Sequence, residues 1–114
     1  MSVHSNTYVL VGVKLPFEHF NEDQRESHED YTDSSRKGIH HHNGLCVIDD
    51  GMSGEYCFIG RVLAKSIDEH GEGICPTDCT VDGTIVVAEV ADLLKQHFDL
   101  DDPDVRVWAF THYR

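Results

Sequence analysis

The sequence predicts an α+β domain in which a mainly antiparallel four-stranded sheet carries one helix packed on a face. Three observations lead to this fold class. Four runs are rich in aliphatic, β-branched and aromatic residues, a later run has helical periodicity, and residues typical of turns separate these runs. The chain of 114 residues is close to the usual size of one domain, so we expect a single domain over residues 1–114.

The first predicted strand spans Thr7–Leu15, where the run YVLVGVKL is almost continuously apolar, as is typical of a buried central strand. Pro16 then ends it. The following residues, 17–43, hold many carboxylates and few aliphatic side chains, with no sustained period of 2 or 3.6. We interpret this segment as a polar surface excursion, a long acidic loop after the first strand with at most one helical turn near its start.

A β-hairpin is predicted from Leu45–Asp49 and Tyr56–Lys65. The loop between these two strand-like runs contains Gly51 and Gly54, which are free to adopt a positive φ. Ser66–Gly83 is rich in turn-forming residues and is predicted to be irregular.

The only long helical pattern covers Ile85–Phe98, and Thr84 before it has the character of an N-cap. One stripe of this helix would face the sheet, formed by Val86, Val90, Leu93, Leu94 and His97. The last strand is predicted over Val105–His112, with Trp108 and Phe110 on the same side. Aromatic residues so placed are typical of a core, and the alternative is the interface of a homodimer.

The charge of the chain excludes some classes of partner. Nine Lys and Arg against 21 Asp and Glu give a formal net charge of −12 at pH 7. Nucleic acids and anionic membranes are polyanions, so we expect neither to be bound directly. No run approaches the roughly 18–20 apolar residues of a membrane-spanning helix, and no signal-peptide pattern is visible. We therefore expect a cytoplasmic protein with reduced thiols.

The density of carboxylates in the polar segment is its most distinctive feature. Those between positions 18 and 33 are Glu18, Glu22, Asp23, Glu26, Glu29, Asp30 and Asp33. A second acidic stretch, Asp99–Asp104, precedes the last strand. Solvation alone accounts for such runs, and the functional alternative is a surface that attracts a basic protein partner. The leading hypothesis is a non-enzymatic binding or modulator protein that uses this acidic surface.

A metal-binding function is the rival hypothesis. His40, His41 and His42 are consecutive, and imidazole is a common ligand of Zn²⁺ or another divalent metal. Consecutive side chains on an extended backbone point in different directions, so a histidine tripeptide seldom supplies all the ligands. A solvated polar loop is the structural alternative.

Carboxylates also gather at the predicted hairpin tip. Asp49, Asp50 and Glu55 would suit a divalent metal in a small metal-dependent hydrolase. Asp-Gly is equally the ordinary sequence of a turn. The chain has no P-loop, dinucleotide-binding glycine motif, H-E-x-x-H or EF-hand loop, so no recognised motif indicates an enzyme.

The four cysteines, Cys46, Cys57, Cys75 and Cys79, lack the C-x2-C spacing of zinc knuckles. Cys46 and Cys57 lie on the two arms of the hairpin, and we expect them roughly opposite one another if the loop closes near Met52 and Ser53. A reactive thiolate needs a neighbouring cation or helix start, which nothing local supplies. We expect the cysteines to act as small buried hydrophobic residues.

Overall fold

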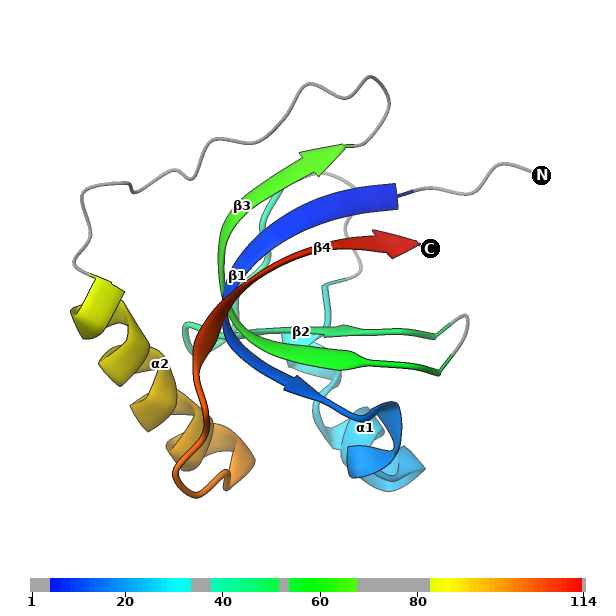
Figure 1. Cartoon of the computed structure of the whole chain (residues 1–114). Coiled ribbons are helices and arrows are strands. Elements are labelled where there is room, and N and C mark those ends of the chain that lie inside the picture. The colour runs from blue at the N-terminus through cyan, green and yellow to red at the C-terminus, as the bar shows by residue number, and fades with distance from the viewer. Residues whose placement is uncertain (1–4, 34–37, 52–53, 68–82, 114) are drawn as a thin grey trace.

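Four antiparallel strands form one sheet in the computed structural model, which describes residues 5–33, 38–51, 54–67 and 83–113 (Figure 1). The strands are β1 (Ser5–Leu15), β2 (Cys46–Asp49), β3 (Cys57–Ile67) and β4 (Arg106–Tyr113), and their order in the sheet is β2-β3-β1-β4. The main helix is α2 (Gly83–Phe98). The predicted α+β class is thus confirmed, and β1 is the central strand that its apolar run indicated.

The sheet is bent sharply, so that its two halves face each other (Figure 1). Phe58 on β3 and Phe110 on β4 stack with their ring centroids 3.7 Å apart, although β1 lies between these strands. At the bend that joins the two halves, Gly12 of β1 is paired with Gly60 of β3. A Cβ atom on Gly12 would lie 2.0 Å from the carbonyl oxygen of Ile59, so only glycine permits this backbone approach.

Each side of the bent sheet has its own apolar cluster. On the outer side α2 contributes Val86, Val90, Leu94 and Phe98, which pack with Val11, Val13, Leu45, Val47, Cys57 and Ile59. Between the two halves lie Tyr8, Leu10, Cys46, Ile48, Phe58 and Val62, against which Tyr56, Trp108 and Phe110 pack. The aromatic residues of β4 are therefore partly buried against the inner cluster, and the sheet covers much of its own inner face without a second helix.

Residues 17–31 are not irregular throughout, in contrast to the predicted loop. They form η1 (Phe17–His19), α1 (Glu22–Ser27) and η2 (Glu29–Tyr31). A capping box begins α1: Asn21 Oδ1 accepts from the Gln24 N–H at 2.8 Å, and Gln24 Oε1 accepts from the Asn21 N–H at 2.9 Å. This local chemistry starts a helix too short to show a hydrophobic period.

The hairpin is confirmed, but its register differs from the one expected. Cys46 is opposite Gly60, and Cys57 is opposite Asp49, so the two cysteines do not face each other. Both are buried free thiols, in different apolar clusters. The predicted positions Cys75 and Cys79 lie outside the described residues.

The predicted helical stripe is confirmed in part, and α2 begins at Gly83 and therefore includes the expected N-cap residue Thr84. Val86, Val90 and Leu94 are buried against the sheet, Leu93 is partly buried beside them, and His97 is only half-buried. Among the described residues, no helix is long and apolar enough to cross a membrane.

Candidate functional site

Residues 17–33, which we call the acidic segment, pack against the C-terminal end of α2 through a cluster of rings around Phe98. The Phe98 ring centroid lies 6.2 Å from Phe20, 4.6 Å from His28 and 4.8 Å from Tyr31. Burial lowers the pKa of His28, which favours the neutral form of its ring among these aromatic neighbours. As a result, α1 and the turn after α2 lie at the same end of the molecule (Figure 1).

This packing brings together two acidic stretches that are far apart in the sequence. We call the following exposed carboxylates the acidic end: Glu18, Glu22, Asp23, Glu26, Glu29, Asp30, Asp99, Asp101, Asp102 and Asp104. Asp104 pairs with Arg106 at 2.9 Å. In the part of the chain that the structure describes, the others form no ion pair.

Arg25 lies within the acidic segment, but among the described residues it forms no ion pair with the carboxylates there. Its Nε and Nη2 donate to the carbonyl oxygen of Phe20 at 3.2 and 3.0 Å, and its guanidinium lies 4.1 Å from the ring centroid of Phe17. The Arg25 side chain therefore contributes mainly a contact with an aromatic ring and hydrogen bonds to the backbone. Beside it, a shallow open groove is lined by Glu22, Arg25, Glu26, Glu29 and Thr32.

Asp33 does not belong to this surface, in contrast to the sequence prediction. It is only 6% exposed, and its Oδ2 accepts hydrogen bonds from the Tyr8 hydroxyl at 2.6 Å and from Lys65 Nζ at 2.8 Å. Its own N–H donates to the carbonyl oxygen of Val47, which draws this end of the acidic segment onto β2. Tyr31, two residues before Asp33, is also buried. An aromatic residue within this polar segment is the sequence signal that the chain approaches the core here.

The three consecutive histidines have three different surroundings. His40 Nε2 lies 2.7 Å from the carbonyl oxygen of Asp30, His41 Nε2 accepts from the Val62 N–H at 3.0 Å, and the His42 ring packs on Tyr31. Among the described residues, no group of three His, Cys, Asp or Glu side chains is placed to hold a metal ion. The described geometry thus gives the predicted metal site no support.

Of the three carboxylates predicted at the hairpin tip, that of Asp50 helps to close the turn. Asp50 Oδ2 accepts from the Glu55 N–H at 3.1 Å, and the Asp50 N–H donates to the carbonyl oxygen of Tyr56 at 2.9 Å. Asp50 is buried and Glu55 is exposed, while Asp49 is paired with Cys57 in the ladder. These roles are those of an ordinary Asp-Gly turn.

The Cys57 thiol is unsuited to nucleophilic chemistry. Burial, followed by the nearby carboxylate of Asp49, raises its pKa to about 12. The thiolate is therefore scarce at neutral pH, as expected for a structural cysteine.

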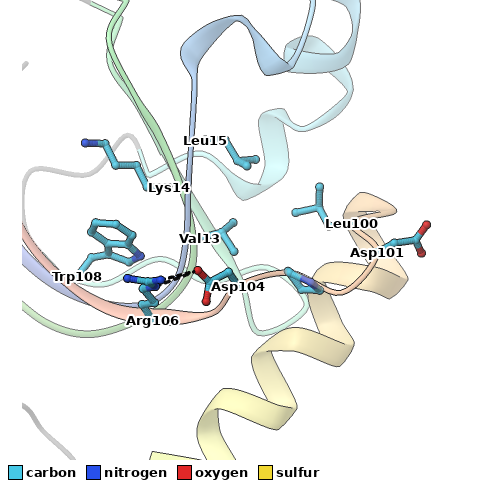
Figure 2. Close-up of a pocket in the computed structure, with 9 residues that line it drawn as sticks. Val13, Lys14, Leu15, Leu100, Asp101, Asp104, Arg106 and Trp108 are labelled. Carbon is cyan, nitrogen blue, oxygen red and sulfur yellow. Dashed lines mark hydrogen bonds and ion pairs between the residues drawn. The ribbon is translucent and has the colours of Figure 1, made fainter.

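A pocket of about 390 Å³ adjoins the acidic end (Figure 2). It is lined by Val13, Lys14, Leu15, Leu100, Asp101, Pro103, Asp104, Arg106 and Trp108. Figure 2 shows Lys14, Trp108 and Arg106 on one side and Leu100 with Asp101 on the other. The apolar floor suits an apolar side chain, and the lining contains no Ser, Cys or His nucleophile.

The sequence did not predict this pocket, because its walls come from the end of β1 and from both sides of the turn before β4. The only signal was Leu100, an aliphatic residue within an acidic turn. Comparisons with known protein families, curated proteins and solved structures find no match. The acidic end and this pocket are therefore the features from which we infer a function.

Proposed function

We propose that the protein is a non-enzymatic binding or modulator protein whose acidic end docks a basic surface of a partner protein. One observation carries this proposal: the packing around Phe98 gathers two distant acidic stretches at one end of the molecule, with their carboxylates in solvent.

Clustering of like charges is unfavourable to the folded chain itself, since neighbouring carboxylates repel one another. The same cluster produces a negative potential that extends about one Debye length into solvent, roughly 8–10 Å near physiological salt. A basic protein surface would be steered toward this end, and release of the mutual repulsion would favour the complex.

The pocket supplies the second component of a docking surface. Charged rims govern encounter rates, whereas buried apolar anchors provide most of the binding energy of protein interfaces. Leu15 and Leu100 line the pocket, together with the carboxylates of Asp101 and Asp104 and the cations of Lys14 and Arg106. The expected partner segment therefore carries one apolar side chain for the pocket and, farther along, lysine or arginine side chains that reach the acidic end.

Two charge-matched variants test the proposal. Glu26→Gln with Glu29→Gln removes two carboxylates of the acidic end, and Glu89→Gln with Asp92→Asn removes two exposed carboxylates of α2. The probe is a synthetic lysine- and arginine-rich peptide with one central leucine, and the measurement is its association rate by surface plasmon resonance.

We expect the first variant to bind the peptide several-fold more slowly than the second, and binding to the native protein to weaken strongly by about 0.5 M salt. The same immobilised proteins, exposed to a cell extract, should retain basic proteins at low salt only. Equal binding by the two variants, or retention unaffected by salt, would contradict the proposed mechanism.

A further inference from the structure

β4 is an edge strand of the sheet in the part of the chain that the structure describes, and β1 is its only partner strand there. Among those described residues, no strand pairs with the backbone N–H and C=O groups of residues 107–111 on the other side. Val107 on this strand is 63% exposed, the highest value for a large hydrophobic residue in the described part of the chain.

The opposite edge of the sheet, the outer side of β2, is partly covered by the chain. Thr32 forms a parallel bridge with Val47 of β2, and the Asp33 N–H donates to the Val47 carbonyl oxygen at 3.0 Å. The chain after η2 thus covers the outer edge of β2, while nothing in the described residues covers that of β4.

The sequence of β4 also lacks the usual protection of an edge strand. Natural proteins discourage edge pairing with lysine, proline or a bulge. Residues 107–111 read VWAFT, with no charge and no proline, and their pairing with β1 is regular. A strand with this composition is suited to pairing through its backbone.

We propose that β4 pairs antiparallel with β4 of a second copy of this chain, about a two-fold axis at Ala109, and joins the two sheets into one. This register places Val107 opposite Thr111 of the second copy and Ala109 opposite its own equivalent, so the exposed side of the new ladder is uncharged. On the inner side Trp108 meets Phe110, and the aromatic clusters of the two sheets become continuous.

Of the two ways in which two β4 strands can pair, the charge distribution favours the antiparallel one. The acidic turn that ends at Asp104 directly precedes β4, so antiparallel pairing puts the two acidic ends at opposite ends of the dimer. A parallel arrangement would bring them together. An uncharged strand offers a basic partner no electrostatic gain, whereas an identical strand matches it in length and composition.

Sedimentation velocity over a wide range of protein concentration tests the pairing. Ala109→Lys places two ammonium groups on the axis, and Ala88→Lys puts the same charge on an exposed position of α2 as a control. We expect the native protein and the control to dimerise and Ala109→Lys to weaken the dimer at least about tenfold. Circular dichroism of each variant checks that the fold is kept.

A cross-link provides an independent readout of the register. Residues directly opposite in an antiparallel ladder have Cβ atoms close enough for a disulfide, so Ala109→Cys should form a covalent dimer under mild oxidation and Ala88→Cys should not. A native protein that stays monomeric at every concentration would overturn the proposal. So would a dimer that Ala109→Lys leaves intact.

Discussion

Lys65 and His41 show how single side chains fix the segment that follows η2. Lys65 Nζ donates to Asp33 Oδ2 at 2.8 Å and to the carbonyl oxygen of Gly38 at 2.9 Å, and the side chains of Lys65 and Asp33 are only 3% and 1% exposed. Removing two charges from water opposes their attraction, so such a pair adds little net stability. Its contribution is positional: it holds the chain on both sides of residues 34–37 to β3.

His41 acts through a hydrogen bond that requires a neutral ring. Its Nε2 accepts the Val62 N–H, which a protonated ring cannot do. Burial, the positive charge of Arg61 and the neighbouring His40 lower the pKa of His41, and the carboxylate of Asp33 opposes them. In the unfolded chain the pKa returns to its ordinary value of 6.5.

His41 should therefore make the free energy of unfolding depend on pH. Above pH 6.5 both states are neutral, and below it the unfolded chain binds a proton that the folded chain resists, so stability falls as pH decreases toward the folded pKa. Glutamine keeps an acceptor but does not titrate. We expect native protein to lose about 0.5 kcal/mol more than His41→Gln between pH 7 and pH 5, a small difference because the ring is partly solvated.

Urea unfolding at a series of pH values measures this difference. His28 and the other histidines are common to both proteins, so their contributions cancel in the comparison. Parallel pH profiles for the two proteins would show that His41 does not titrate differently in the folded state.

At the scale of elements, the bend between the two halves of the sheet determines most of the architecture. Gly12 and Gly60 are paired on β1 and β3, and a Cβ on Gly60 would lie 2.1 Å from the Val11 carbonyl oxygen. Both obstructing groups are backbone, which cannot rotate away as a side chain can. The close approach lets the two halves meet and bury Phe58 against Phe110.

Gly12→Ala should accordingly destabilise the protein by about 3 kcal/mol, the upper part of the range for overpacking. Gly51→Ala is the control, because nothing lies within 4 Å of a Cβ there and its φ is not in the left-handed region. Denaturant unfolding of the two variants checks the difference. A Gly12→Ala protein as stable as the control would mean that the strands separate at little cost.

The positions of β1 and α2, whose patterns lie in consecutive residues, were predicted correctly. The register of the hairpin and the burial of Asp33, which depend on contacts between distant residues, were not. The continuous apolar run of β1 and the stripe of α2 are patterns of neighbouring residues, so the positions of both elements can be predicted from hydrophobic periodicity. The pairing of Cys57 with Asp49 depends on how the hairpin loop closes. The burial of Asp33 depends on where Tyr8 and Lys65 come to lie after the sheet bends, which no local pattern records.

At the scale of the whole molecule, negative charge is concentrated rather than spread. The formal net charge is −12, and the acidic end holds carboxylates from both acidic stretches. Unfolding would move these groups apart, so their repulsion destabilises the compact state. The buried Lys65–Asp33 pair is little affected by salt, while the exposed pair of Arg61 and Glu89 contributes little to stability.

Added sodium chloride should therefore stabilise the protein. We expect the free energy of unfolding to rise by about 1 kcal/mol between about 0.01 M and about 0.5 M salt, because the screening length shortens from roughly 30 Å to a few ångströms. Chloride is preferable to sulfate, which strengthens apolar burial by itself. Glu26→Gln with Glu29→Gln should show a smaller rise in thermal melts, and a stability that falls with salt would argue against clustered repulsion.

The pairing of β1 with β4 joins Ser5 to Tyr113, so the central strand receives one neighbour only when nearly the whole of this sequence is available. A growing chain can assemble the hairpin of β2 and β3 early, but β1 keeps one side unpaired until β4 has left the ribosome. Long-range closure of this kind slows folding, because loop entropy must be overcome before the contacts form. Until β4 pairs with it, β1 therefore exposes one unpaired side of an apolar strand, a condition that promotes aggregation of incomplete chains.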